Sequence, residues 1–165
     1  MNLATIIVKW TGPYSLDKVR HSEKKNGIYL LAGKTKYQRL SEIQYCGITE
    51  NYFYNRITSK GHKLAKIRED TLSIWLGEII YPSEFGRWHL EVAEHCFIYF
   101  WETPLNEKKR IYCPNRPVCF ISQWFTCDDE PRLRRPSIMN GKPDILWWDE
   151  ERWRTGKLKV WPKSE

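Results

Sequence analysis

The sequence lacks several patterns that mark large classes of proteins. It has no CxxC pair, and three of its five cysteines, Cys113, Cys119 and Cys127, have a spacing that matches no common zinc site. No stretch approaches the roughly 18 apolar residues of a membrane span, and residues 1–16 contain no basic segment followed by a small-residue cleavage site. We therefore expect a cytoplasmic protein with reduced, mostly buried thiols and no contact with a membrane.

Aromatic and basic residues, in contrast, are plentiful. Aromatic residues make up 15% of the chain and include nine tryptophans, most of which we expect in the core. The 27 Lys and Arg outnumber the 20 Asp and Glu and give a net charge of +7. This balance fits an anionic partner such as nucleic acid without requiring one. The length of 165 residues predicts one domain.

Apolar periodicity predicts a mixture of strands and helices. Two short apolar runs, 27–32 and 42–48, flank a basic link and favour a β-hairpin. Helical periodicity predicts one long helix at 83–102. The remaining elements are expected as a polar helical turn within 15–25, short helices at about 51–60 and 62–69, strands at 3–10, 71–79 and 118–125, and a strand-to-helix junction at 144–153.

One acid lies among the apolar positions of the long helix. At about 100° per residue, Glu94 shares a side of that helix with Leu90 and Ile98, one turn away in each direction. A buried unpaired charge is expensive, so Glu94 must be paired, bind a metal or face a cleft. The alternative is a structural acid at the margin of the stripe, or one paired with a buried arginine.

Five short motifs follow one another along the chain. Gly-Ile-Tyr at 27–29 precedes Tyr-Cys-Gly at 45–47, Arg56 stands in a basic helix, Glu94 lies on the later helix, and the sequence TPLN supplies Asn106. Each motif alone is weak, because two tyrosines in an isolated hairpin are most often a plain aromatic pair. The order and spacing of all five carry more information.

This order resembles the GIY-YIG nuclease superfamily over roughly residues 25–107. The resemblance implies an α/β (α+β) fold with a small three-stranded antiparallel sheet flanked by helices. It implies a nuclease domain with an N-terminal extension at 1–107. Residues 108–165, rich in Pro, Trp and basic residues, are expected to pack on this core as a C-terminal extension. Several features depart from the family pattern, among them Cys46 in the second motif, the long link from Lys34 to Ser41, and Ile48-Thr49 where many members carry a Lys.

The resemblance also implies a catalytic set of Tyr29, Tyr45, Arg56 and Glu94. Glu94 would hold one Mg²⁺ (or Mn²⁺), which keeps its water shell and needs few protein ligands. Arg56 can offer two parallel N–H groups to phosphate oxygens. A free phenol has a pKa of about 10, so a tyrosine base needs nearby positive charge. By resemblance Tyr45 is the base that faces water and Tyr29 its partner, although the residues alone do not decide between them.

Basic residues around Arg56 predict contacts with nucleic acid. Residues 51–68 hold five Lys and Arg and no acid. Many family members carry a His one turn after the arginine; here Lys60 takes that position and His62 follows, so either could supply a charge or shuttle a proton. The run RLRRP at 132–136 either grips phosphates or forms a solvated loop. The nucleic-acid contacts that we expect are Lys60, His62, Lys63, Lys66 and Asn106.

Together these features predict a metal-dependent endonuclease that cleaves DNA phosphodiester bonds by tyrosine-assisted attack of water. RNA is not excluded as a substrate, and a homodimer or a partner protein could supply specificity. Two alternatives of other classes stay open. One is a non-catalytic nucleic-acid-binding or regulatory module on a nuclease scaffold. The other is a subunit of a larger defence or repair complex, with the C-terminal tryptophans as interface anchors.

Overall fold

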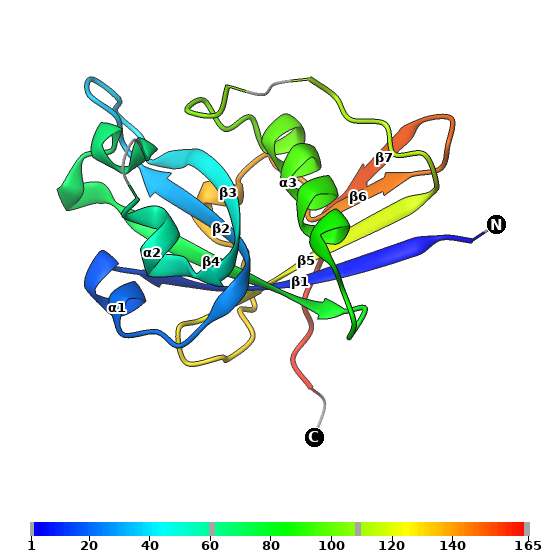
Figure 1. Cartoon of the computed structure of the whole chain (residues 1–165), viewed down its shortest axis with the longest axis horizontal. Coiled ribbons are helices and arrows are strands. Elements are labelled where there is room, and N and C mark those ends of the chain that lie inside the picture. Colours follow the sequence, from blue (N-terminus) through cyan, green and yellow to red (C-terminus); the bar gives the residue numbers. More distant parts are fainter. Residues whose placement is uncertain (1, 60–61, 108–109, 164–165) are drawn as a thin grey trace.

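The computed structural model describes residues 2–59, 62–107 and 110–163. Within these ranges the chain forms seven strands, three α-helices and three 3-10 turns (Figure 1). The strands are β1 (Ala4–Tyr14), β2 (Lys25–Gly33), β3 (Glu42–Tyr52), β4 (Ser73–Tyr81), β5 (Val118–Phe125), β6 (Ile145–Trp148) and β7 (Trp153–Gly156). The helices are α1 (Leu16–Arg20), α2 (Phe53–Ile57) and α3 (Arg87–Trp101), and the 3-10 turns are η1 (Lys63–Lys66), η2 (Glu69–Thr71) and η3 (Ser137–Met139).

The strands form one mixed sheet in the order β3-β2-β4-β1-β5-β6-β7. β1 pairs antiparallel with β4 and parallel with β5. The expected small three-stranded antiparallel sheet flanked by helices is therefore wrong, because β2, β3 and β4 are one end of a seven-stranded sheet that carries only three α-helices within the described residues. The physical reason lies in β1. Its fully buried side chains, Ile6, Val8 and Trp10, place this strand inside the sheet, where both of its edges need a neighbour.

Residues beyond 107 add strands to that same sheet. β5 runs beside β1 in register from Ala4↔Val118 to Thr11↔Phe125, and β6 and β7 continue outward from β5. The expected C-terminal extension packed on a small three-stranded sheet is therefore corrected as well, because β5, β6 and β7 are strands of the one sheet. The division of the chain at residue 107 stays a prediction, but the sheet is continuous across it.

Most local elements agree with the sequence. The hairpin of β2 and β3, the helical turn α1, the strand β5 and the long helix α3 are confirmed within a few residues. The second short helix, expected at 62–69, is wrong, because this segment forms the 3-10 turn η1 and then extended backbone. The junction expected at 144–153 is also wrong and is the β6–β7 hairpin.

None of the helices among the described residues is long and apolar enough to cross a membrane.

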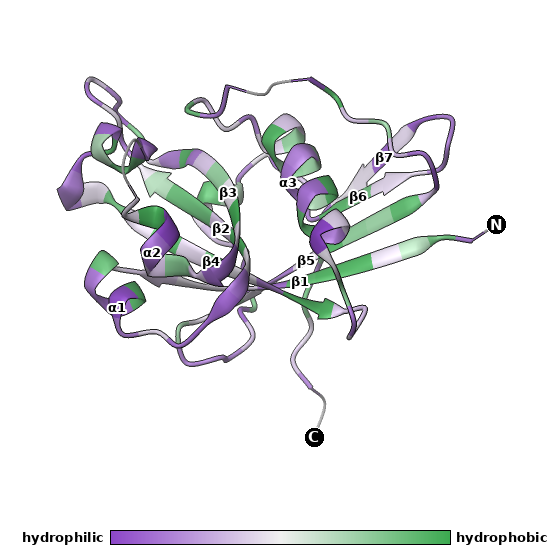
Figure 2. Cartoon of the chain, viewed as in Figure 1, coloured by the Kyte–Doolittle hydropathy of each residue, from purple (hydrophilic) through white to green (hydrophobic). Residues whose placement is uncertain are grey.

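α3 covers one face of the sheet and closes an aromatic core. Trp10 stacks on Trp124 with ring centroids 5.6 Å apart, and Phe97 stacks on Trp101 at 4.2 Å. All four rings are buried, which is the destination expected for these tryptophans. Figure 2 shows apolar positions along β1 and β5 where they pass beneath α3.

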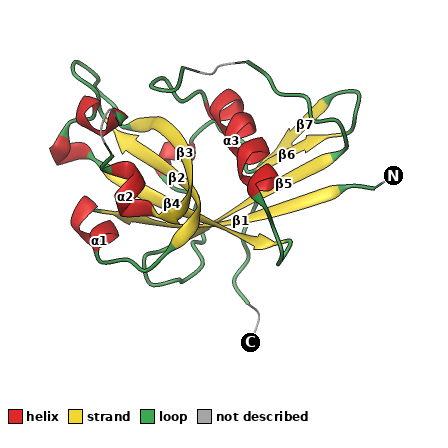
Figure 3. Ribbon diagram, in the orientation of Figure 1, coloured by secondary structure: helices red, strands yellow, loops and turns green. Residues whose placement is uncertain are grey.

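α1 and α2 cover the opposite face, at the other end of the sheet (Figure 3). Tyr29 and Leu31 of β2 pack there with Phe53 and Ile57 of α2, whereas Leu30 packs on the side of α3. β2 is therefore buried on both faces. Its neighbour β3 is an edge strand, so side chains from α2 and from α3 can meet beside it.

Candidate active site

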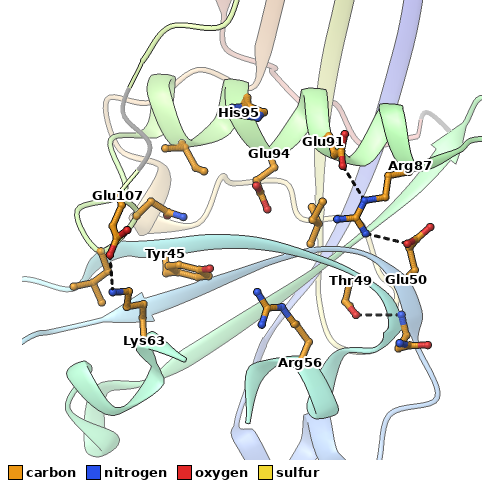
Figure 4. Close-up of a pocket in the computed structure, with 15 residues that line it drawn as sticks. Tyr45, Thr49, Glu50, Arg56, Lys63, Arg87, Glu91, Glu94, His95 and Glu107 are labelled. Atoms are coloured by element: carbon orange, nitrogen blue, oxygen red, sulfur yellow. Dashed lines mark hydrogen bonds and ion pairs between the residues drawn. The ribbon is translucent and has the colours of Figure 1, made fainter. Parts of the chain in front are cut away.

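A hollow of about 900 Å³ lies along β3, between α2 and α3 (Figure 4). In Figure 4 the Glu94 carboxylate points from α3 toward Tyr45 of β3, and the Arg56 guanidinium reaches from α2 toward the same space. Lys63 and Asn106 also line the hollow. The sheet edge thus brings together five of the residues that the sequence singled out.

The two tyrosines lie diagonally across the hairpin. Tyr29 is directly opposite Gly47, and Tyr45 is opposite Leu31. Their ring centroids are 6.1 Å apart, which is within reach of a diagonal aromatic pair. A Cβ atom at Gly47 would overlap the ring and the hydroxyl of Tyr29. The glycine of the second motif therefore provides the space into which the phenol of the first motif extends.

Of the two tyrosines, Tyr45 is the one that reaches the hollow. Tyr29 is fully buried, whereas Tyr45 is half-buried and lines the hollow. Burial raises the pKa of both phenols above the ordinary value, strongly so for Tyr29. At Tyr45 the charge of Glu94 raises the pKa further, whereas Arg56 and a hydrogen bond with Tyr29 lower it.

His62 completes a hydrogen-bond chain behind the tyrosines. Its Nδ1 accepts the backbone N–H of Leu64 at 3.3 Å, so the proton of the neutral ring resides on Nε2. Nε2 lies 2.7 Å from the Tyr29 hydroxyl oxygen and donates to it. The Tyr29 ring packs beside Tyr45, and a hydrogen bond between the two tyrosines lowers the pKa of Tyr45. Burial and two nearby cations lower the pKa of His62 to about 4, which keeps the ring neutral near pH 7.

Arg56 is exposed and held by its own helix end. Its Nη1 donates to the Ser59 hydroxyl at 3.2 Å, and that hydroxyl donates to the carbonyl of Arg56 at 2.7 Å. The positive charge is close enough to lower the pKa of both tyrosines. An exposed guanidinium with this orientation can bind phosphate oxygens in a bidentate manner.

Asn106 binds the main chain of the second motif. Its Oδ1 accepts the Cys46 N–H, and its Nδ2 donates to the Cys46 carbonyl, both at 2.9 Å. Thr103 donates to the same Oδ1 at 2.6 Å. This amide therefore occupies the outer edge of β3 beside Tyr45. Its contact with nucleic acid stays a prediction, and the structure gives it a further role in fixing the strand.

The expected nucleic-acid contacts are distributed unevenly. Lys63 lines the hollow and forms an ion pair with Glu107 at 3.5 Å. His62 points to Tyr29, and Lys66 is exposed at the end of η1. Lys60 lies outside the described residues.

The RLRRP run has a partner inside the protein. The Arg135 guanidinium forms an ion pair with the buried carboxylate of Asp144, with Nε and Oδ2 2.8 Å apart. Trp124 Nε1 donates to the other oxygen of that carboxylate at 3.0 Å. At least this arginine therefore holds the fold together.

One end of the hollow carries an ion-pair cluster that sequence reasoning missed. Arg87 donates from Nη1 to Glu50 at 2.9 Å and from Nε to Glu91 at 2.8 Å (Figure 4). The four-residue spacing of Arg87 and Glu91 on a helix was a visible signal. Glu50 is 37 positions away, and no sequence signal pointed to it.

Glu94 fits the metal ion that the resemblance implies. No group of three or more His, Cys, Asp and Glu side chains that could hold a metal occurs among the described residues. Mg²⁺ usually keeps several waters and uses one or two carboxylates. A single glutamate that faces a roomy hollow has the donor chemistry for such a hydrated Mg²⁺ or Mn²⁺ ion.

Comparisons of the chain with protein-family models, with curated proteins and with solved structures found no match. The resemblance to the GIY-YIG superfamily therefore stays a prediction that depends on the five motifs.

Proposed function

We propose that the protein is a cytoplasmic, metal-dependent endonuclease that hydrolyses DNA phosphodiester bonds, as its resemblance to the GIY-YIG superfamily implies. The observation that carries the proposal is the convergence of Tyr45, Arg56 and Glu94 on one hollow from three separate elements. If Tyr45 were only a core aromatic residue, Arg56 only a solvated side chain and Glu94 only an acid at the edge of an apolar stripe, nothing would require them to share a hollow. A phosphodiesterase needs a base, a phosphate ligand and a metal ligand within one site.

Tyr45 is the proposed base. As a phenolate it takes a proton from a water molecule while the water oxygen attacks phosphorus. The bond from phosphorus to the leaving sugar oxygen then breaks, and that oxygen takes a proton from solvent. The partial exposure of Tyr45 gives it access to this water, whereas the buried Tyr29 has none.

The residues behind Tyr45 orient its oxygen. His62 donates to Tyr29, and the hydrogen bond that Tyr29 makes with Tyr45 lowers the pKa of Tyr45. A hydrogen bond to the charged form favours that form. Arg56 holds the phosphoryl oxygens and adds positive charge near the phenolate.

A divalent ion held by Glu94 would neutralise its carboxylate, lower the pKa of Tyr45 and act as a Lewis acid on the phosphoryl group.

Plasmid nicking tests the proposal. Supercoiled plasmid is incubated with the protein and Mg²⁺, beside Glu94→Gln and beside Glu91→Gln, a matched change on the same helix. We expect the wild type and Glu91→Gln to nick the plasmid, and Glu94→Gln to lose at least 100-fold, on the order of the effect of a lost transition-state contact.

A panel of branched DNA, single-stranded DNA and RNA accompanies the plasmid, so that the substrate is not missed. Retained binding without cleavage of any member would overturn the nuclease and support the non-catalytic binding module. Equal activity of Glu94→Gln and the wild type would overturn the metal-ligand role. Sedimentation tests the homodimer or partner protein that could supply specificity.

A further inference from the structure

The link between β2 and β3, residues 34–41, exposes large apolar side chains. Tyr37 is 87% exposed and Leu40 is 77% exposed. Tyr37 also has a φ of 75°, in the left-handed region that bulky residues avoid. Such a conformation costs on the order of 1–2 kcal/mol. A contact with another molecule would account for both the strained backbone and the exposed ring of Tyr37.

Hydrogen bonds hold the part of the loop that carries Tyr37 and Leu40 in place. Gln38 accepts the Thr35 N–H at 2.8 Å and the Gln44 amide at 2.7 Å. Gln44 is fully buried and also donates to the Gly33 carbonyl at 2.9 Å. Since Gln44 precedes Tyr45 on β3, the loop and the candidate base are fixed to the same strand.

A second basic segment lies beside the loop. Thr35 forms a β-bridge with Ile67, and the Arg68 N–H donates to the Lys34 carbonyl at 2.8 Å. Figure 1 shows the loop projecting from the end of the β2–β3 hairpin, next to the turns between α2 and β4. The segments 34–41 and 63–68 are therefore neighbours although the sequence separates them.

The two segments together are basic and free of acid. They contain six Lys and Arg and no Asp or Glu. Among the described residues, the ion pairs of these segments are those of Lys63 with Glu107 and of Arg68 with Asp70. The other four cations are Lys34, Lys36, Arg39 and Lys66.

We propose that segments 34–41 and 63–68 form a docking surface for a nucleic-acid strand, which we name the loop surface. Its cations bind backbone phosphates, and Tyr37 and Leu40 contact bases. Interleaved cations and an exposed aromatic ring are the chemistry that recognises a polyanion with stackable faces. A protein partner would match the apolar tip but would not need the four cations that form no ion pair among the described residues.

The loop surface leads to the hollow. Lys63 belongs to both, because it lines the hollow beside Tyr45 and starts the second basic segment. A strand seated on the loop surface can therefore continue past Lys63 toward Tyr45. This inference rests on the proposed function, since it assigns the substrate path of the same site.

Binding is measured by fluorescence anisotropy with fluorescein-labelled 20-mers, single-stranded and duplex, in a salt series. All proteins carry Glu94→Ala so that cleavage does not interfere. We expect Lys36→Ala with Arg39→Ala to weaken binding at least tenfold and to reduce the slope of log K against log salt by about two. The matched control is Lys157→Ala with Lys159→Ala, which removes two exposed cations from the C-terminal tail.

The Tyr37→Ala variant distinguishes contacts with nucleic-acid bases from the charge attraction of the loop cations. We expect about a tenfold loss with an unchanged salt slope, and Tyr37→Phe to bind like the parent, because base stacking needs the ring and not the hydroxyl. A larger loss on single strands than on duplex assigns stacking on an unpaired base, and an equal loss assigns insertion into a duplex.

The outcomes separate the two proposals. If the parent protein binds no nucleic acid, the proposed function fails and the loop surface fails with it. If the parent binds and the loop variants bind equally well, only the loop surface is overturned. Sedimentation that shows self-association lost in Tyr37→Ala, with nucleic-acid binding intact, would assign the loop to a second copy of the chain and overturn the inference.

Discussion

At the scale of single residues, Gly47 matters because its missing side chain leaves space for the Tyr29 ring. The sequence shows a glycine two positions after Tyr45, and the structure shows that the Tyr29 phenol occupies the space beside it. The glycine of the Tyr-Cys-Gly motif is therefore required for the packing of β2 against β3.

Gly47→Ala tests this packing. The added methyl overlaps the ring and hydroxyl of Tyr29, which is confined on every side. We expect a loss of about 1–3 kcal/mol in the free energy of unfolding, the usual cost of overpacking a core. Urea denaturation measures it. Gly156→Ala on β7 is the control, because its new methyl would meet only ordinary contacts, and a similar loss there would contradict the packing argument.

The lowered pKa of His62 should make the stability of the protein depend on pH. Its pKa is about 4 in the folded protein, through burial and then the charges of Arg56 and Lys63, against 6.5 for the ordinary group. Between these values the unfolded chain binds a proton that the folded protein does not. Stability is therefore complete above about pH 6.5 and falls as the pH drops toward 4.

We expect His62 to account for about 1–2 kcal/mol of that loss, less than the full linkage value because the ring is partly exposed and solvent screens its charge. The measurement is the free energy of unfolding of the wild type and His62→Gln at pH 4.5 and pH 7. The difference between the two proteins should change with pH. Parallel curves would rule out a titrating His62.

The sequence identified residues that line the candidate site, but not the contacts between them. Tyr45, Arg56 and Glu94 were found because each breaks a local pattern or matches a motif. The link from His62 to Tyr29 was not foreseen, because it depends on the extended conformation of His62 just before η1 and not on helical spacing. Glu50 was missed because its partner Arg87 lies on another element.

At the scale of elements, β3 is an edge strand that is covered by a loop. Leu105 donates to the Gln44 carbonyl at 2.9 Å, and Asn106 satisfies both main-chain groups of Cys46. Edge strands expose unpaired groups to water or to other chains. Here the loop after α3 takes the place of a further strand and keeps Tyr45 in position.

Asn106→Ala tests this covering. It leaves the buried N–H and carbonyl of Cys46 without partners, so we expect a loss of about 2–4 kcal/mol in the free energy of unfolding. Faster hydrogen exchange at the Cys46 amide should accompany it. The exposed Asn140→Ala is the control. An unchanged exchange rate at Cys46 would show that the amide does not hold the strand.

Elements were predictable where their pattern is local. The alternation in β5 and the helical period of α3 are written into neighbouring residues, and both were recognised. The short segments around residues 62–71 and 144–156 were not, because a few residues carry too little periodicity to separate a 3-10 turn or a short hairpin from a helix.

At the scale of the whole molecule, the sheet order was beyond the sequence. β1 and β5 are more than a hundred positions apart, and nothing local states that they pair in parallel. Trp10 Nε1 donates to the Ser122 hydroxyl at 3.1 Å across this pairing, a bond between residues 112 positions apart. The sequence predicted a nuclease domain at 1–107 with residues 108–165 packed on it as an extension, whereas the structure pairs β1 with β5 inside one sheet.

A truncation after residue 107 tests whether the two parts form one folding unit. Removing β5 exposes one whole edge of β1 and takes Trp124 from its stack with Trp10. The lost strand also removes the buried side chains Val118 and Phe120 from the core. Full burial of each such side chain contributes about 1.5–3 kcal/mol, and a domain has only about 5–15 kcal/mol of net stability. We therefore expect residues 1–107 to be unfolded or aggregated, with no near-ultraviolet circular dichroism from packed tryptophans. Co-expression of 108–165 as a separate chain should restore that signal, because the strand pairing does not require a covalent link. A cooperative unfolding transition for 1–107 alone would show instead that β5 to β7 are an accessory to a complete domain.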